Sequence, residues 1–169
     1  NVFNLTQGAS GYNNYAHWLL DIVPKIKILS LVYNLKNIDY FYFSKLNRFQ
    51  KETFRILKLD SIKIIDSKSN KHCLMENLIF CTHPNYIKGT FSYAQSNIPK
   101  WIIKYLRKIF LPAGSKNIKK FKKIYIDRSD SKYNHCKIIN DFEIQEYLKK
   151  QGFKVIRLSK YSLKKQISI

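Results

Sequence analysis

The alternation of short apolar strands with amphipathic helices limits most strongly what this chain can fold into. Residues 38–44 form an aromatic run, Ile-Asp-Tyr-Phe-Tyr-Phe-Ser, which predicts a strand. A helical pattern at residues 48–57, a short strand at 62–65 and a β-rich segment at 73–81 follow. Strands separated by helical stretches are typical of βαβ units and a parallel sheet. The sequence therefore predicts an α/β fold.

Residues 13–34 carry the clearest helical pattern in the chain. Apolar side chains recur there at three- and four-residue spacing, which predicts one buried helix face. They are Trp18, Leu19, Ile22, Val23, Ile26 and Leu29. Pro24 lies inside the run and has no backbone N–H, so we expect a kink or a break about one turn before it. A second amphipathic helix is predicted at residues 98–110.

A composition change at Pro112-Ala113-Gly114-Ser115 predicts a domain boundary. After it the pattern begins again, with a strand at residues 123–127, a helix at 139–150 and a strand at 153–158. Gly152 is well placed to close that helix.

One βαβ unit of about fifty residues buries too little surface to be a domain by itself. We therefore expect an N-terminal domain at residues 1–112 and a linker at 113–122. Residues 123–169 are then expected to be the incomplete start of a second domain.

The net charge of +20 allows an anionic partner, but the lysines are scattered along the chain. Lysine, asparagine, isoleucine and tyrosine are abundant together, which AT-rich codon usage would produce. A solvated basic surface is the simpler interpretation, and a surface for phosphates or anionic membrane lipids stays open. No stretch of about 18 uncharged apolar residues is present, so no transmembrane helix is expected.

Three cysteines without a CxxC pair argue against a disulfide framework and favour a reducing compartment. Cys73 and Cys81 lie in or beside apolar runs and are expected to be small core residues. The His and Cys residues are not clustered at the spacing of zinc ligands. These features favour the cytoplasm, with peripheral attachment at the membrane face left open.

His17 and Asp21 are the first pair of side chains that could carry chemistry. They are four residues apart in the predicted helix, so the carboxylate can orient or charge-stabilise the imidazole. The same spacing also fits a pair that only stabilises its own helix.

A second group of polar residues surrounds the predicted strand end at Arg128. Arginine at the carboxyl end of a parallel strand, followed by a helix N-terminus, is suited to bind an anion. Lys137 follows in the loop. Asn140 is expected to cap the next helix, with Glu143 completing a capping box. Anion binding and capping are compatible.

Two ordered blocks of this sequence resemble the signatures of glycosyltransferase family 61. The first is His17-Trp18-Leu19-Leu20-Asp21 before a proline-containing helix. The second is a strand ending in Asp127-Arg128, then Lys137, Asn140-Asp141 and Glu143, then Gly152-Phe153-Lys154-Val155 and Gln166. Asp141 stands where the family usually has glutamate, and the Gly/His-rich segment expected after the glutamine is absent, so the chain resembles a member truncated at its C-terminus.

The resemblance implies a GT-B-like enzyme with one Rossmann-like acceptor-side domain and the opening βαβ unit of a nucleotide-sugar-binding domain. Such an enzyme moves a sugar from a nucleotide-sugar donor to a glycan or glycoconjugate acceptor, with inversion and without a metal or other cofactor. His17, steered by Asp21, is the hypothetical base, and a purely structural role for His17 stays open. Arg128 and Lys137 would neutralise the diphosphate. Asn14, Asn140 and Glu143 are further candidate substrate contacts.

Two other functions remain open at this point. A basic nucleic-acid-binding α/β domain would need exposed aromatic and basic side chains on one face. The aromatics here fall mostly inside apolar periodic runs, so no nucleic-acid partner is expected. The remaining alternative is an inactive, truncated family member.

Overall fold

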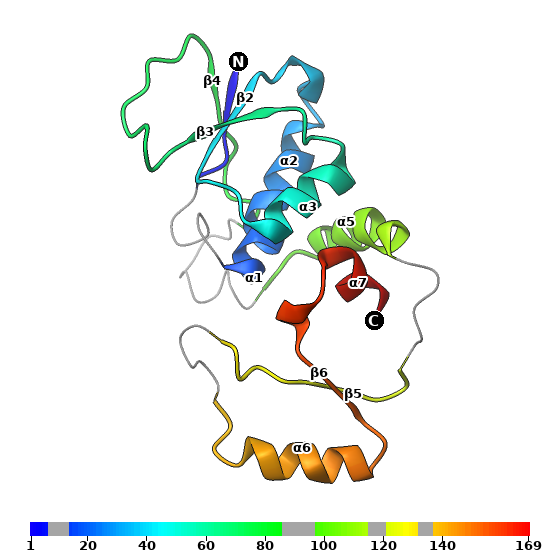
Figure 1. The fold of residues 1–169 in the computed structure, drawn as a ribbon. Coiled ribbons are helices and arrows are strands. Elements are labelled where there is room, and N and C mark those ends of the chain that lie inside the picture. Colours follow the sequence, from blue (N-terminus) through cyan, green and yellow to red (C-terminus); the bar gives the residue numbers. More distant parts are fainter. Residues whose placement is uncertain (7–13, 86–96, 115–120, 132–136) are drawn as a thin grey trace. The chain divides into compact units, whose positions relative to one another are not determined.

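The computed structural model describes residues 1–6, 14–85, 97–114, 121–131 and 137–169. The chain divides into two compact units, Asn1–Phe110 and Leu111–Ile169 (Figure 1). Each unit contains a parallel sheet and helices, so the predicted α/β class is confirmed.

The first unit is built on a four-stranded parallel sheet in the order β3-β2-β1-β4. Its strands are β1 (Val2–Asn4), β2 (Tyr40–Phe43), β3 (Lys63–Asp66) and β4 (Leu78–Ile79). The interior strand β1 was not predicted from the sequence.

The helical segment after β1 changes from α-helix to π-helix in the turn before Pro24. It runs through α1 (Tyr15–His17), the π-helix η2 (Trp18–Ile22) and α2 (Val23–Leu29). Pro24 supplies no N–H to the turn before it, and the Val23 N–H bonds instead to the Trp18 carbonyl five residues back. The break expected one turn before Pro24 is confirmed as a π-helix. The helix ends at Leu29, sooner than predicted, and the 3-10 turn η3 (Leu35–Asn37) leads into β2.

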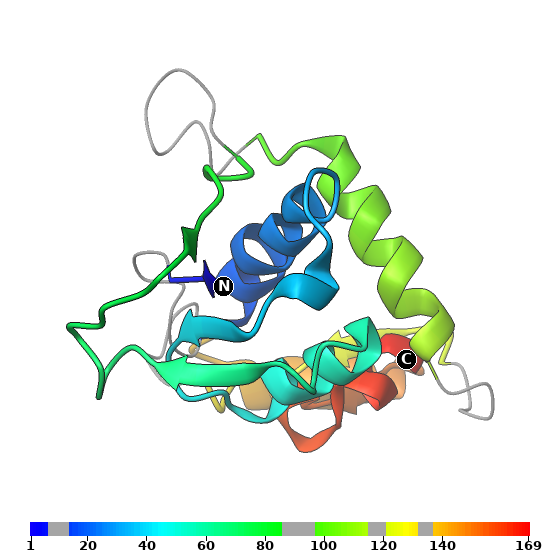
Figure 2. The ribbon, with the colours of Figure 1, turned by 90° about the horizontal axis from the view of Figure 1, so that it is seen from above.

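The core of this unit lies between one face of the sheet and the helices α2 and α3 (Arg48–Leu57) (Figures 1 and 2). Trp18 is fully buried against Phe43 and Phe54. Its Nε1–H donates to Thr53 Oγ1 at 3.0 Å, so the buried indole is satisfied. The predicted apolar stripe is therefore the core face of the helix.

Helix α3 has the predicted bounds, and helix α5 (Lys100–Phe110) begins two residues after its predicted start and packs on α3. Asn47 caps α3 in a reciprocal capping box with Gln50. At the other end of α3, Lys58 adopts the left-handed conformation, with φ of 58°. None of the helices in the described part of the chain is long and apolar enough to cross a membrane.

The segment before β4 is less regular than predicted. Of the β-rich stretch 73–81, only Leu78 and Ile79 pair in the sheet. Cys73 is exposed, with its Sγ near the Asn70 carbonyl, so the prediction of a core cysteine is wrong there. The residues around it form turns and bends, and the neighbouring Leu74 is fully exposed. Cys81 is half-buried and lies against the core.

The second unit contains the predicted strand–helix–strand sequence. Strands β5 (Ile124–Ile126) and β6 (Lys154–Ile156) pair in parallel and are connected through α6 (Asp141–Lys150). The short helices of this unit are η4 (Leu111–Ala113), η5 (Leu158–Lys160) and α7 (Leu163–Ser168).

Gly152 ends α6 as predicted. Its φ of +79° lies in the left-handed region. The Gly152 N–H bonds to the Lys149 carbonyl and the Phe153 N–H to the Leu148 carbonyl. This pair of bonds is the Schellman motif, which closes the helix before β6.

Candidate functional site

His17 and Asp21 form a hydrogen-bonded pair on the helical segment that follows β1. His17 Nδ1 lies 2.6 Å from Asp21 Oδ2, and their side chains are 28% and 10% exposed. The pair that the four-residue spacing predicts is formed. Asn14 caps the segment, because its Oδ1 accepts the backbone N–H groups of Ala16 and His17. The amide nitrogen of Asn14 makes no hydrogen bond with the described residues and could donate to a substrate.

A second histidine approaches the same carboxylate from another part of the chain. His83 Nε2 lies 3.5 Å from Asp21 Oδ1, and the His83 side chain is 30% exposed. The Asn85 backbone N–H donates to His83 Nδ1 at 2.9 Å. His83 was not predicted from the sequence, since helical spacing relates only residues of one helix. Its position shortly after the predicted β-rich segment 73–81, at the carboxyl end of a strand, could have indicated it as a site residue.

Lys25 lies one helical turn beyond Asp21 and is only 5% exposed. Its Nζ donates to the Thr6 carbonyl at 3.4 Å. Burial lowers the pKa of Lys25, against the opposing effects of Cys81 and Asp21. Burial also raises the pKa of the Cys81 thiol, and Lys25 works against this. The group around Asp21 thus contains a buried lysine in addition to two histidines.

These residues gather at the carboxyl edge of the parallel sheet. Thr6 follows β1, the helix with His17 is the next described element, and Cys81 and His83 follow β4. Strand β1 lies between β2 and β4 in the sheet. The chain continues from β1 to β2, whereas β4 pairs with the opposite edge of β1. In open α/β sheets, ligands bind at the carboxyl edge between two adjacent strands whose following connections run in opposite directions.

The electrostatics around Asp21 favour a neutral His83. Burial lowers its pKa from the ordinary 6.5, and the Lys25 and His17 side chains lower it further. Asp21 acts in the opposite direction. The uncharged form of His83 is therefore favoured at neutral pH.

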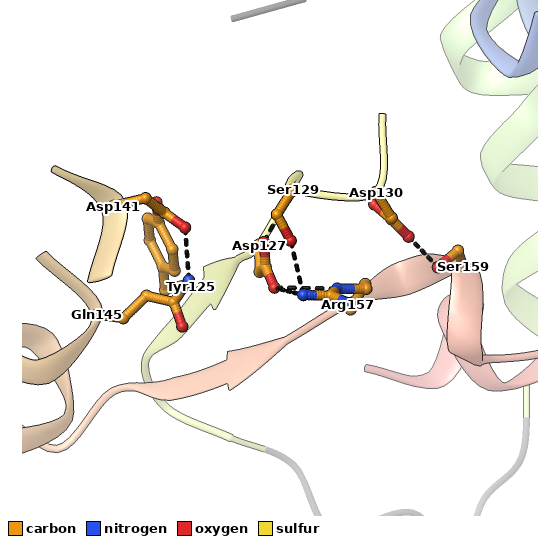
Figure 3. Close-up of polar contacts among 8 residues, drawn as sticks. All are labelled: Tyr125, Asp127, Ser129, Asp130, Asp141, Gln145, Arg157 and Ser159. Carbon is orange, nitrogen blue, oxygen red and sulfur yellow. Dashed lines mark hydrogen bonds and ion pairs between the residues drawn. The ribbon is translucent and has the colours of Figure 1, made fainter. Parts of the chain in front are cut away.

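In the second unit, Asp127 at the end of β5 is buried and held by Arg157 from the end of β6 (Figure 3). Arg157 donates from Nε and Nη2 to Asp127 Oδ2 at 3.0 and 2.5 Å, and from Nη2 to Ser129 Oγ at 2.6 Å. The Ser129 backbone N–H, followed by Arg157, lowers the pKa of Asp127 to about 2 despite its burial. The same bond to Asp127 raises the pKa of Arg157.

The loop after Asp127 is tied down on both sides of Arg128. Ser159 Oγ donates to Asp130 Oδ2 (Figure 3). The Ser131 N–H donates to the Arg128 carbonyl. Arg128 itself is exposed, and its guanidinium pairs with no carboxylate within the described ranges. Arg128, the predicted anion-binding residue, thus lies exposed on a loop that hydrogen bonds hold in place. The same hydrogen-bond network contains Arg157, whose guanidinium is already paired with Asp127.

The predicted capping box of α6 is wrong. Asn140 has φ of −102° and ψ of 37°, and its side chain makes no cap hydrogen bond. An N-cap side chain reaches the helix N–H groups from an extended backbone, which Asn140 does not have. Lys137, Asn140 and Glu143 are all exposed. The first turn of α6 is instead fastened through Asp141, which accepts hydrogen bonds from Tyr125 Oη and Gln145 Nε2 (Figure 3).

Gln166 makes a structural contact within the second unit. Gln166 Nε2 donates to the Leu158 and Tyr161 carbonyls, which ties α7 to η5. Among the side chains that the structure describes, no three His, Cys, Asp or Glu residues are grouped to hold a metal ion.

Comparison with known proteins identifies the family. The family model described as glycosyltransferase 61 matches residues 15–169, from the helix that carries His17 to the end of the second unit. No curated protein and no solved structure matches the chain. The family match covers both groups of polar residues and most of the chain, so the chain belongs to the glycosyltransferase 61 family.

Proposed function

We propose that this family member transfers a sugar from a nucleotide-sugar donor to a glycan or glycoconjugate acceptor, with inversion and without a metal ion. The observation that carries the proposal is the His17–Asp21 pair at the carboxyl edge of a parallel sheet. An inverting transfer needs a base for the acceptor hydroxyl, and an imidazole held by a carboxylate is suited to that task.

His17 is the base in this proposal. An ionised carboxylate only accepts hydrogen bonds, so the 2.6 Å contact assigns the hydrogen of a neutral His17 to Nδ1. Nε2 then keeps its lone pair and can take a proton from an acceptor hydroxyl. Asp21 also stabilises the imidazolium that forms during the transfer.

Arg128 binds the donor diphosphate, with help from Lys137. Both side chains are exposed, and the hydrogen bonds of Ser129 and Asp130 hold the loop that carries Arg128. A guanidinium can give two parallel hydrogen bonds to a phosphate and stabilise the charge that grows on the leaving group. Asn140 and Glu143, at the start of α6, are proposed to contact the nucleotide or the sugar.

The proposed enzyme is GT-B-like. Residues 1–112 supply the acceptor side, 113–122 are a linker, and residues from 123 onward belong to the donor side. We place the reaction in the cytoplasm. The net charge of +20 would favour transient binding to an anionic membrane surface, and no nucleic-acid partner is proposed.

A donor panel tests this function. The full-length enzyme is incubated with a set of nucleotide sugars, and release of free nucleotide and transfer to added glycans are measured. One nucleotide sugar should be consumed well above the buffer rate. Arg128→Ala should weaken binding of that donor about tenfold, the loss expected of one charge-assisted contact. Arg55→Ala, at an exposed arginine of α3, is the matched control. Failure of every donor to bind or turn over would contradict the proposal.

A further inference from the structure

Two imidazoles lie within 3.5 Å of the Asp21 carboxylate, and Lys25 interacts with it electrostatically; these side chains come from two distant parts of the chain. His17 and Lys25 lie one turn before and one turn after Asp21, and His83 follows β4. The two imidazoles lie on different oxygens, His17 on Oδ2 and His83 on Oδ1. Asp21 is therefore approached from two sides rather than from its own helix alone.

The hydrogen-bond partners of the two histidines differ in a way that separates their roles. His83 Nδ1 accepts the Asn85 N–H, so a neutral His83 carries its hydrogen on Nε2, which faces Asp21. Nδ1 is therefore engaged, and Nε2 carries its hydrogen 3.5 Å from Asp21 Oδ1, at the long limit of hydrogen-bond distance. His17 has Nδ1 on Asp21, and no described residue occupies its Nε2 lone pair. The pair thus contains one candidate base and one supporting imidazole.

We propose that His83 is a positioning residue: as a neutral imidazole it holds the Asp21 carboxylate so that Asp21 keeps His17 in the tautomer with a free Nε2. This inference rests on the proposed function in one respect, namely that His17 is the base. His83 itself does not touch the substrate.

The surroundings of His83 keep it in the form that this role needs. A proton on Nδ1 would break the bond from the Asn85 N–H. Burial, Lys25 and His17 all act against protonation of His83, and only Asp21 favours it. At low pH a charged His83 would compete with His17 for Asp21. We therefore expect support of His17 to be lost only when the pH falls below the ordinary histidine range.

The test compares His83→Phe with His83→Gln in the full-length enzyme. Phenylalanine keeps a ring of similar size but has no donor, whereas the glutamine amide can still donate to Asp21. His83→Phe should lower kcat about tenfold, part of what general base catalysis contributes. KM for donor and acceptor should change less than about twofold. His83→Gln should restore most of kcat, and His72→Phe, at an exposed histidine, should leave it unchanged.

A second readout does not depend on transfer. The ¹⁵N chemical shifts of the His17 ring report which nitrogen carries the hydrogen. In the unmodified protein above the histidine pKa range, Nε2 should show the shift of an unprotonated nitrogen. In His83→Phe the two nitrogens should shift toward a mixture of tautomers. Unchanged His17 shifts in a folded His83→Phe variant would overturn the positioning role.

The two readouts separate this inference from the proposed function. If His17→Ala retains full activity while His83→Phe still changes the His17 tautomer, the base assignment fails and the positioning contact stands. If His17→Ala abolishes transfer and His83→Phe changes neither kcat nor the tautomer, the positioning role fails alone.

Discussion

The two units each present a buried aspartate at the carboxyl edge of a parallel sheet, but they surround it differently. Asp21 faces two histidines and a buried lysine, and it contacts His83 only at 3.5 Å. Asp127 is held by a guanidinium at 2.5 and 3.0 Å, with a backbone N–H and a serine hydroxyl adding to the network. Imidazoles change charge near neutral pH, whereas a guanidinium stays charged. The first arrangement is therefore suited to moving a proton, and the second to fixing a loop.

The largest effect should come from Asp21→Asn. The amide can donate a hydrogen bond to His17 Nδ1, which favours the tautomer with the hydrogen on Nε2 and removes the proposed base. We expect kcat to fall about 100-fold or more, within the usual contribution of general base catalysis, with donor affinity unchanged. Steady-state kinetics and calorimetry measure the two quantities. Asp60→Asn, at an exposed aspartate, is the control. A normal kcat in Asp21→Asn would contradict the view that Asp21, unlike Asp127, takes part in proton transfer.

The next effect is on stability, from Asp127→Asn. Loss of the charge-assisted bonds from Arg157 should lower the free energy of unfolding by about 2 kcal/mol at neutral pH. The pKa of Asp127 is lowered from 3.8 to about 2 in the folded protein, so its stabilisation is complete above 3.8 and is lost as the pH falls toward 2. This acid-dependent component of the unfolding free energy should be missing from Asp127→Asn.

Denaturant unfolding at neutral and acidic pH measures this component. Asp130→Asn, in the same loop but exposed, should show a smaller loss. Equal losses in the two variants would contradict the view that Asp127 is the point at which the loop is held.

Lys25→Met should change a titration rather than the fold. Lys25 lowers the pKa of His83, so its removal should raise that pKa. An NMR titration of the His83 ring protons measures the shift. Lys27→Met, on the same helix, is not expected to change it. An unaltered His83 titration in Lys25→Met would show that the lysine does not influence the histidine.

The smallest effect concerns the two helix caps. Asn47→Ala should cost about 1 kcal/mol of unfolding free energy, because Asn47 forms a reciprocal capping box. Asn140→Ala should change it by less than about 0.5 kcal/mol, because Asn140 makes no cap hydrogen bond. Thermal or denaturant unfolding measures both values. Equal losses of unfolding free energy in Asn47→Ala and Asn140→Ala would contradict the expectation that only Asn47 caps its helix with a side chain.

The parts of the fold that the sequence predicts are those with local causes. The apolar stripe from Trp18 to Leu29, the break before Pro24 and the closing glycine at Gly152 each depend on residues within a few positions. The helix at 48–57 has both a strong pattern and a capping box, and its predicted bounds match α3.

The parts that the sequence does not predict depend on residues far apart in the chain. His83 reaches Asp21 because β1 and β4 are neighbours, which no spacing along the chain indicates. Arg157 reaches Asp127 because β5 and β6 pair in register. At Asn140 the residue types of a cap are present, but the backbone does not take the conformation that a cap needs.

The most direct test of the account is a comparison of sugar transfer by the unmodified full-length enzyme and by His17→Ala, with donor binding measured calorimetrically on the same preparations. If His17 is the base, the variant should lose transfer by about 100-fold or more and bind the nucleotide sugar with an unchanged Kd. Transfer at the normal rate by a folded His17→Ala variant would contradict the central claim that the Asp21-held imidazole performs the chemistry.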